Sequence, residues 1–119
     1  MSQLKKFKAL IIDCDGTLVP NAMKGLPSAK VTTAINNIPK IIHVGIATSR
    51  PLFLAKPIMD HLKLSGPSII SGGSQIIDGK TFKILKEQDI AREDMFSVVT
   101  IFKKYNINYL AQDGQNEDE

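Results

Sequence analysis

Residues 9–18 read Ala-Leu-Ile-Ile-Asp-Cys-Asp-Gly-Thr-Leu, an apolar run that leads directly into two closely spaced acids. The run at residues 9–12 has the length and aliphatic content of a buried strand, so the acids fall where that strand ends. Residues two apart in an extended chain point the same way, and Asp13 and Asp15 can therefore face one site. Gly16 permits a sharp turn beside them. Open α/β sheets bind ligands at the carboxyl ends of their strands, which favours a functional site here over a plain acidic turn.

Two carboxylates this close repel each other. A hard divalent cation such as Mg²⁺ relieves the repulsion and prefers oxygen ligands. Thr17 is able to hydrogen-bond the turn or a ligand held in it. The sequence therefore predicts a magnesium site at Asp13 and Asp15.

The rest of the pattern alternates strands with helices. Ser28 is a suitable N-cap for the first helix and Pro39 stops it, while Pro51 suits the first turn of the second helix and Pro57 is expected to kink or restart it. This alternation predicts right-handed crossovers and a parallel sheet, hence an α/β fold. Strands are expected at residues 7–12, 41–47 and 68–70, and helices at residues 28–38 and 51–62.

The alternation of strands and helices ends after residue 74. Short apolar runs at residues 75–77 and 82–85 flank Asp78-Gly79 and predict a hairpin. Helical periodicity predicts a helix at residues 92–105, and residues 107–110 suggest another strand. The polar, acidic stretch at residues 112–119 is expected to be loose.

Composition excludes several classes of protein. The 119 residues are enough for one domain at most, and 15 basic against 12 acidic residues give a net charge of +3. Without tryptophan, an arginine-rich face or an aromatic ladder, we expect no nucleic-acid partner. The apolar runs are too short for a bilayer and none resembles a signal peptide, so no membrane partner is expected. Cys14, the single cysteine, excludes an internal disulfide, fits a cytoplasmic protein and is expected to be buried away from the acids.

A second group of polar residues, Thr48-Ser49-Arg50, follows the second predicted strand. Hydroxyls and backbone amides at a strand-to-helix junction bind phosphate well, because the helix N-terminus adds positive potential. A Thr-Ser pair by itself is more often a helix cap. Its expected place beside the acids, at the same edge of the sheet, favours a phosphate site.

These residues resemble a known family. Residues 13–18 resemble the first motif of the haloacid dehalogenase superfamily of phosphohydrolases, residues 46–51 resemble the second, and residues 69–78 are similar to the stretch before the cap in the Cof-type branch. The resemblance implies a Rossmann-like three-layer sandwich with a parallel sheet. It assigns residues 1–79 to the first half of the core and residues 80–119 to the beginning of an α+β cap.

The resemblance also implies roles. Asp13 would be the nucleophile that forms an aspartyl-phosphate, and Asp15 would protonate the leaving oxygen. Mg²⁺ would be held by the Asp13 carboxylate and the Asp15 backbone carbonyl. Gly16, Thr48 and Ser49 would bind the phosphate of a small phosphorylated metabolite.

The sequence departs from the family pattern in three ways. Ser49 replaces a commoner glycine, and Gly72 stands where asparagine is usual. The family also requires a lysine from a later strand and an acidic Gly-Asp loop, both after the cap, which these 119 residues do not supply. We therefore expect a truncated phosphatase that is weakly active or inactive by itself.

Two other functions stay open. One is a non-catalytic interaction protein that keeps the fold without the chemistry. The other is a receiver-like phosphoacceptor module, but such modules place their acceptor aspartate after the third strand, where this chain has Ser71-Gly72-Gly73. The first strand is expected to leave an open edge, which predicts a homodimer or a complementing polypeptide.

Overall fold

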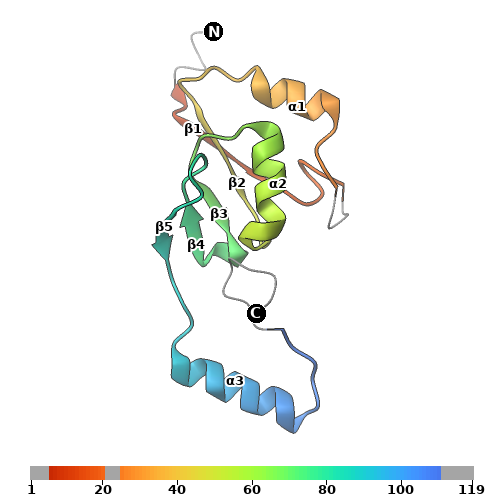
Figure 1. Cartoon of the computed structure of the whole chain (residues 1–119), viewed down its shortest axis with the longest axis vertical. Coiled ribbons are helices and arrows are strands. Elements are labelled where there is room, and N and C mark those ends of the chain that lie inside the picture. Colours follow the sequence, from red (N-terminus) through yellow and green to blue (C-terminus); the bar gives the residue numbers. More distant parts are fainter. Residues whose placement is uncertain (1–5, 21–24, 111–119) are drawn as a thin grey trace.

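The computed structural model describes residues 6–20 and 25–110. Its five strands form one sheet in the order β1-β2-β3-β4-β5, with the first three parallel and the last two antiparallel (Figure 1). This confirms the expected α/β class and Rossmann-like core. The elements are β1 (Ala9–Asp13), α1 (Ala29–Asn36), β2 (His43–Ala47), α2 (Leu52–Leu62), β3 (Ser68–Ile70), the 3-10 turn η2 (Ser71–Gly73), β4 (Gln75–Ile77), β5 (Ile84–Glu87) and α3 (Arg92–Lys104).

The two helices between the parallel strands follow the sequence pattern closely. Ser28 is the N-cap of α1, and its Oγ accepts a hydrogen bond from the Val31 amide at 3.3 Å. Pro57 lies inside α2 without ending it, so the helix does not restart there. Proline has no N–H, so one hydrogen bond of the helix is missing at Pro57. The helix continues because Ile58 and Leu62, which follow it, are buried in the core and stabilise this turn.

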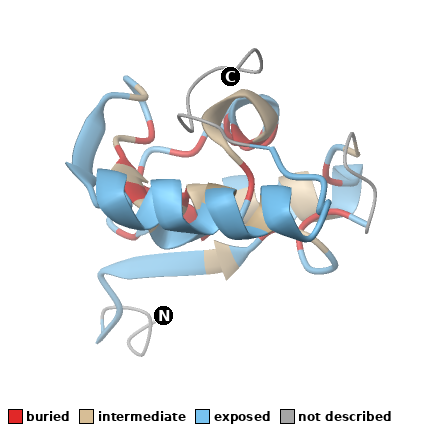
Figure 2. Ribbon diagram, turned by 90° about the horizontal axis from the view of Figure 1, so that it is seen from below, coloured by how far each residue is buried: buried red, intermediate tan, exposed pale blue. Residues whose placement is uncertain are grey.

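Strand alternation divides the sheet into two unlike faces. Ile46, Ile70 and Ile77 lie on the face that packs against α1 and α2, and each is fully buried. Alternate positions lie on the other face, where Ile11 is 44% exposed and Ile69 is half-buried. Figure 2 shows that β1 is largely exposed along its length. The core of the described residues therefore occupies one side of the sheet.

The segment after β3 differs from expectation in detail. The hairpin forms, but its second strand is Ile84–Glu87, because Phe82 adopts a left-handed φ of 58° and packs against the core instead of entering the strand. Asp78 closes the turn by accepting hydrogen bonds from the Lys80 and Thr81 amides.

The last elements stand away from the core. α3 matches the expected helix, but it buries no residue and lies apart from the sheet (Figure 1). The strand expected at residues 107–110 is wrong, since this segment lies beside no strand that could pair with it. The tail predicted at residues 112–119 lies outside the described residues, and the division between residues 79 and 80 stays a prediction. No helix in the described segments is long and apolar enough to cross a membrane.

Candidate functional site

The carboxyl ends of β1 and β2 form the candidate site. Asp13, the last residue of β1, is paired in register with Ala47, the last residue of β2. Thr48 therefore follows β2 at the same edge of the sheet, and its amide donates to the Ile69 carbonyl of β3 at 2.9 Å. The sheet thus brings the two polar groups of the sequence together, as expected for neighbouring parallel strands.

The loop after β1 is closed by its own backbone. The amides of Leu18 and Val19 donate to the Cys14 carbonyl at 2.9 and 3.1 Å, and the Gly16 amide donates to the Val19 carbonyl at 2.8 Å. Gly16 has a φ of 78°, the left-handed conformation that glycine adopts without strain. Buried Leu18 and Val19 anchor the loop in the core, so the acids project from a fixed backbone.

Asp13 is exposed at the end of β1. The Thr17 hydroxyl donates to its Oδ2 at 3.2 Å, which is the turn contact that the sequence suggested for this threonine. The other carboxylate oxygen receives no hydrogen bond from the described residues. Asp13 can therefore offer oxygen to a cation or to an incoming phosphorus atom.

Asp15 is held by an arginine that the sequence interpretation did not assign to the site. Arg50 Nε donates to Asp15 Oδ2 at 3.0 Å, and Arg50 Nη2 donates to Oδ1 at 2.5 Å, so the pair is bidentate. The Arg50 side chain is 7% exposed, whereas that of Asp15 is 39% exposed. Hydrogen bonding to Arg50 lowers the pKa of Asp15, and the same contact raises the pKa of Arg50.

Thr48 and Ser49 differ in environment. Thr48 is buried, and its Oγ1 accepts a hydrogen bond from the Arg50 amide at 3.1 Å in the turn before α2, whose N-cap is Pro51 without a side-chain cap. Ser49 is exposed. The Thr48 hydroxyl is therefore not a helix cap, and a hydroxyl that accepts one bond still has its proton to donate to a phosphate oxygen.

Cys14 lies between Asp13 and Asp15 in the sequence, and its side chain is fully buried. Burial raises the pKa of its thiol, with nearby Arg50 opposing the effect. A thiol with a raised pKa is a poor nucleophile at neutral pH. This matches the expectation of a small buried side chain and leaves the chemistry to the aspartates.

The donor set for a metal is small. Among residues 6–20 and 25–110, no cluster of three or more histidine, cysteine, aspartate or glutamate side chains could hold an ion. The Asp15 carboxylate is occupied by Arg50, but the Asp15 backbone carbonyl accepts no hydrogen bond from these residues. One carboxylate and one carbonyl are oxygen ligands of the kind that Mg²⁺ binds when water and substrate phosphate complete its shell.

The Arg50–Asp15 pair predicts a pH-dependent contribution to stability. Because the folded-state pKa of Asp15 is lowered, the pair stabilises the protein above the unfolded-state pKa of about 3.9 and is lost as the pH falls through the lower folded value. Asp15→Asn is expected to cost about 1 kcal/mol near neutral pH, a small value because the carboxylate is over a third exposed. Thermal unfolding of both proteins should show this difference shrinking as the pH falls below the unfolded-state pKa of about 3.9. A difference that is constant with pH would contradict an ionic pair.

Comparison with known proteins gives one family. The model of the haloacid dehalogenase-like hydrolases matches residues 10–117. No curated protein matches the chain.

Solved structures of such hydrolases share the fold. One from Bacillus subtilis superposes with a TM-score of 0.71 at 23% identity, over 84% of this chain and 34% of that chain. A phosphatase of the superfamily from Bacteroides thetaiotaomicron superposes with a TM-score of 0.71 at 19% identity, over 84% of this chain and 36% of that chain. A HAD/COF-like hydrolase from Plasmodium vivax superposes with a TM-score of 0.65 at 23% identity, over 84% of this chain and 37% of that chain. The chain thus spans about a third of the length of these structures.

Proposed function

Since the chain belongs to the haloacid dehalogenase-like hydrolase family, we propose that it carries the nucleophile and the phosphate-binding edge of a Mg²⁺-dependent phosphatase. The observation that carries the proposal is the pairing of Asp13 with Ala47, which sets an exposed carboxylate beside Thr48 at the carboxyl edge of the sheet. The substrate class is a small phosphorylated metabolite.

Asp13 is the proposed nucleophile. Its carboxylate attacks phosphorus and forms an aspartyl-phosphate while the bond to the leaving oxygen breaks. Thr17 fixes one carboxylate oxygen and so orients the other. Thr48 and the backbone around Gly16 and Ser49 donate hydrogen bonds to the phosphoryl oxygens.

Mg²⁺ would be held by the Asp13 carboxylate and the Asp15 backbone carbonyl. When bound, the ion neutralises the negative charge shared by the enzyme and the phosphate. The free carbonyl and the exposed carboxylate fit an oxygen-binding cation.

Asp15 is the proposed acid and base, and Arg50 controls its protonation. An acid must carry a proton, which the lowered pKa of Asp15 opposes while the pair is intact. A phosphate arriving at Thr48 competes for the Arg50 guanidinium, which binds phosphate as readily as carboxylate. Weakening the pair raises the pKa of Asp15 toward that of a proton donor.

Turnover by this chain is the direct test of the proposal. We expect hydrolysis of 4-nitrophenyl phosphate with Mg²⁺ to stay below the ordinary enzymatic range of about 1–10³ s⁻¹. The reason is that the lysine and the Gly-Asp loop of the family pattern lie outside these residues. The residual activity should disappear with EDTA and in Asp13→Asn. Hydrolysis that survives both treatments would contradict the proposed mechanism.

A polypeptide partner is proposed from the open edge of β1. Phe7 is 62% exposed and Ile11 is 44% exposed. We propose that this edge pairs with a second copy or with a complementing polypeptide, as exposed apolar edge strands tend to do.

Light scattering over a concentration series tests the partner. Dimerisation through β1 should weaken in Ile11→Lys, which places a charge on the exposed face, while Lys56→Gln on α2 serves as the control. A monomer at every concentration, with no complex formed by added C-terminal halves of related hydrolases, would contradict the proposed pairing.

A further inference from the structure

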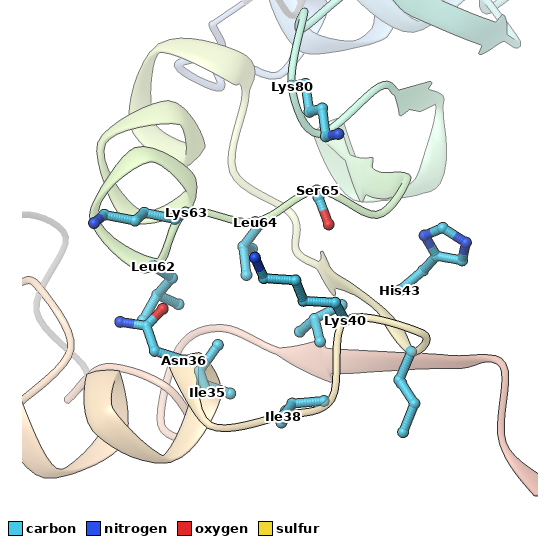
Figure 3. Close-up of a pocket in the computed structure, with 12 residues that line it drawn as sticks. Ile35, Asn36, Ile38, Lys40, His43, Leu62, Lys63, Leu64, Ser65 and Lys80 are labelled. Carbon is cyan, nitrogen blue, oxygen red and sulfur yellow. The ribbon is translucent and has the colours of Figure 1, made fainter. Parts of the chain in front are cut away.

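A pocket lies at the opposite end of the sheet from Asp13. It encloses about 480 Å³ where the C-terminal ends of α1 and α2 meet the start of β2 (Figure 3). His43, on its rim, begins β2, whereas the candidate site lies beyond the end of that strand. Thr48 follows His43 by five residues of extended chain, or about 16 Å. The pocket is therefore distinct from the site of the proposed chemistry.

The rim of the pocket is basic. Lys40 and Lys80 both line the pocket; in Figure 3 the Lys40 ammonium is turned toward Leu64, Lys80 lies on the other side of the Ser65 hydroxyl, and the His43 ring is at the margin. Lys63 points away from the others. No aspartate or glutamate is among the residues that line it. Within the described chain, neither Lys40 nor Lys80 forms an ion pair.

The nearest acids along the chain are already engaged. The Asp78 carboxylate accepts hydrogen bonds from the Lys80 amide and from the amide and hydroxyl of Thr81. Asp60, at the end of α2, pairs with Lys56 at 2.7 Å. The charge of Lys80 also acts on the nearby Asp78 carboxylate, whose pKa it helps to lower, but Lys80 and Asp78 form no ion pair within the described residues.

The fold assembles this rim through two close backbone approaches. A Cβ on Gly79 would lie 2.3 Å from the Gly66 carbonyl oxygen, so the hairpin turn rests directly on that loop. A Cβ on Gly66 would lie 2.8 Å from the Val44 carbonyl oxygen, so the loop rests on β2. These contacts bring Lys80 over Ser65 and opposite Lys40, although Lys40 and Lys80 belong to separate segments.

The floor of the pocket is apolar. Val44, Leu62 and Leu64 are buried there, and Ile35 and Ile38 pack against the same core. A pocket of this volume suits a small molecule, and an apolar floor with a few convergent polar groups is the usual composition of such sites.

We propose that this pocket binds a phosphate ester with an apolar body, at a site separate from Asp13. The ammonium groups of Lys40 and Lys80 and the Ser65 hydroxyl supply donors for the phosphate oxygens, and the aliphatic floor covers the apolar part. The ligand is bound without being hydrolysed, since the pocket has no carboxylate to act as a nucleophile.

The experiment is an amide NMR titration of the full chain with 1-naphthyl phosphate. EDTA is present, so that the metal-dependent site at Asp13 is not loaded. Saturable shifts are expected at Lys40, His43, Ser65 and Lys80, with no matching shifts at Asp13. The neutral analogue 1-naphthalenemethanol should bind about tenfold more weakly or not at all, because it lacks the charge that the lysines recognise.

Matched variants distinguish the effect of the lysine charges inside the pocket from the effect of the protein's overall charge. Lys40→Gln with Lys80→Gln is expected to weaken binding at least about tenfold, whereas Lys63→Gln, whose side chain points away, should change it less than about twofold. All three lysines are exposed, so the variants should keep the wild-type circular dichroism spectrum. Equal binding by the double variant, equal binding of the neutral analogue, or shifts centred on Asp13 would each overturn the proposal.

Discussion

Replacing Asp13 with asparagine is expected to abolish Mg²⁺-dependent binding of beryllium fluoride, a mimic of the phosphoryl group on an aspartate. The reason is that the amide has no anionic oxygen, and its one remaining oxygen is neutral, so it is a weak ligand for the cation and a poor donor to the mimic. Fluorine NMR should show a bound signal in the wild-type chain that requires Mg²⁺ and is absent in the variant.

Asp60→Asn is the matched control for that experiment. Asp60 is an exposed aspartate on α2 whose carboxylate pairs with Lys56. Its replacement removes the same charge from the protein and leaves the sheet edge intact, so the bound signal should persist. If Asp13→Asn kept the signal and Asp60→Asn lost it, the nucleophile would be wrongly assigned.

Gly45→Ala is expected to destabilise the fold more than the same change at Gly66 or Gly79. A Cβ on Gly45 would lie 2.0 Å from the Pro67 carbonyl oxygen and 3.0 Å from its carbon, both in the backbone that leads into β3. Backbone cannot swing aside as a side chain can, so β2 and β3 must separate. We expect a loss of at least about 3 kcal/mol, at the upper end for overpacked cores.

Urea denaturation followed by circular dichroism measures this loss. Ser49→Ala, an exposed position just beyond the same strand, serves as the control and should change the free energy of unfolding by less than about 0.5 kcal/mol. An unchanged midpoint for Gly45→Ala would mean that β2 and β3 are not packed as the structure has them.

The regular part of the fold was predictable because local patterns and tertiary packing agree. Aliphatic runs mark β1, β2 and β3, and the helices between them force a parallel arrangement with neighbouring strands in order. That order alone is enough to set Asp13 beside Thr48. The two polar groups could therefore be placed at one edge from the sequence.

The features that the sequence did not predict depend on contacts between distant residues, which no local pattern encodes. Arg50 reaches Asp15 across 35 residues of sequence, and its position two residues after Thr48 was the available signal. Phe82 is not part of the predicted strand, because its ring packs against the core. The strand predicted at residues 107–110 has a suitable composition but no neighbour to pair with, and a strand needs a partner for its backbone groups.

The most direct test of the proposed site is an amide NMR titration of the chain with Mg²⁺ and inorganic phosphate together. We expect the amides of Asp13, Gly16, Thr48 and Ser49 to shift with one shared dissociation constant, and phosphate to shift them far less when Mg²⁺ is withheld. Shifts that are confined to other parts of the sheet, or that are the same with and without Mg²⁺, would contradict a metal-dependent phosphate site at the ends of β1 and β2.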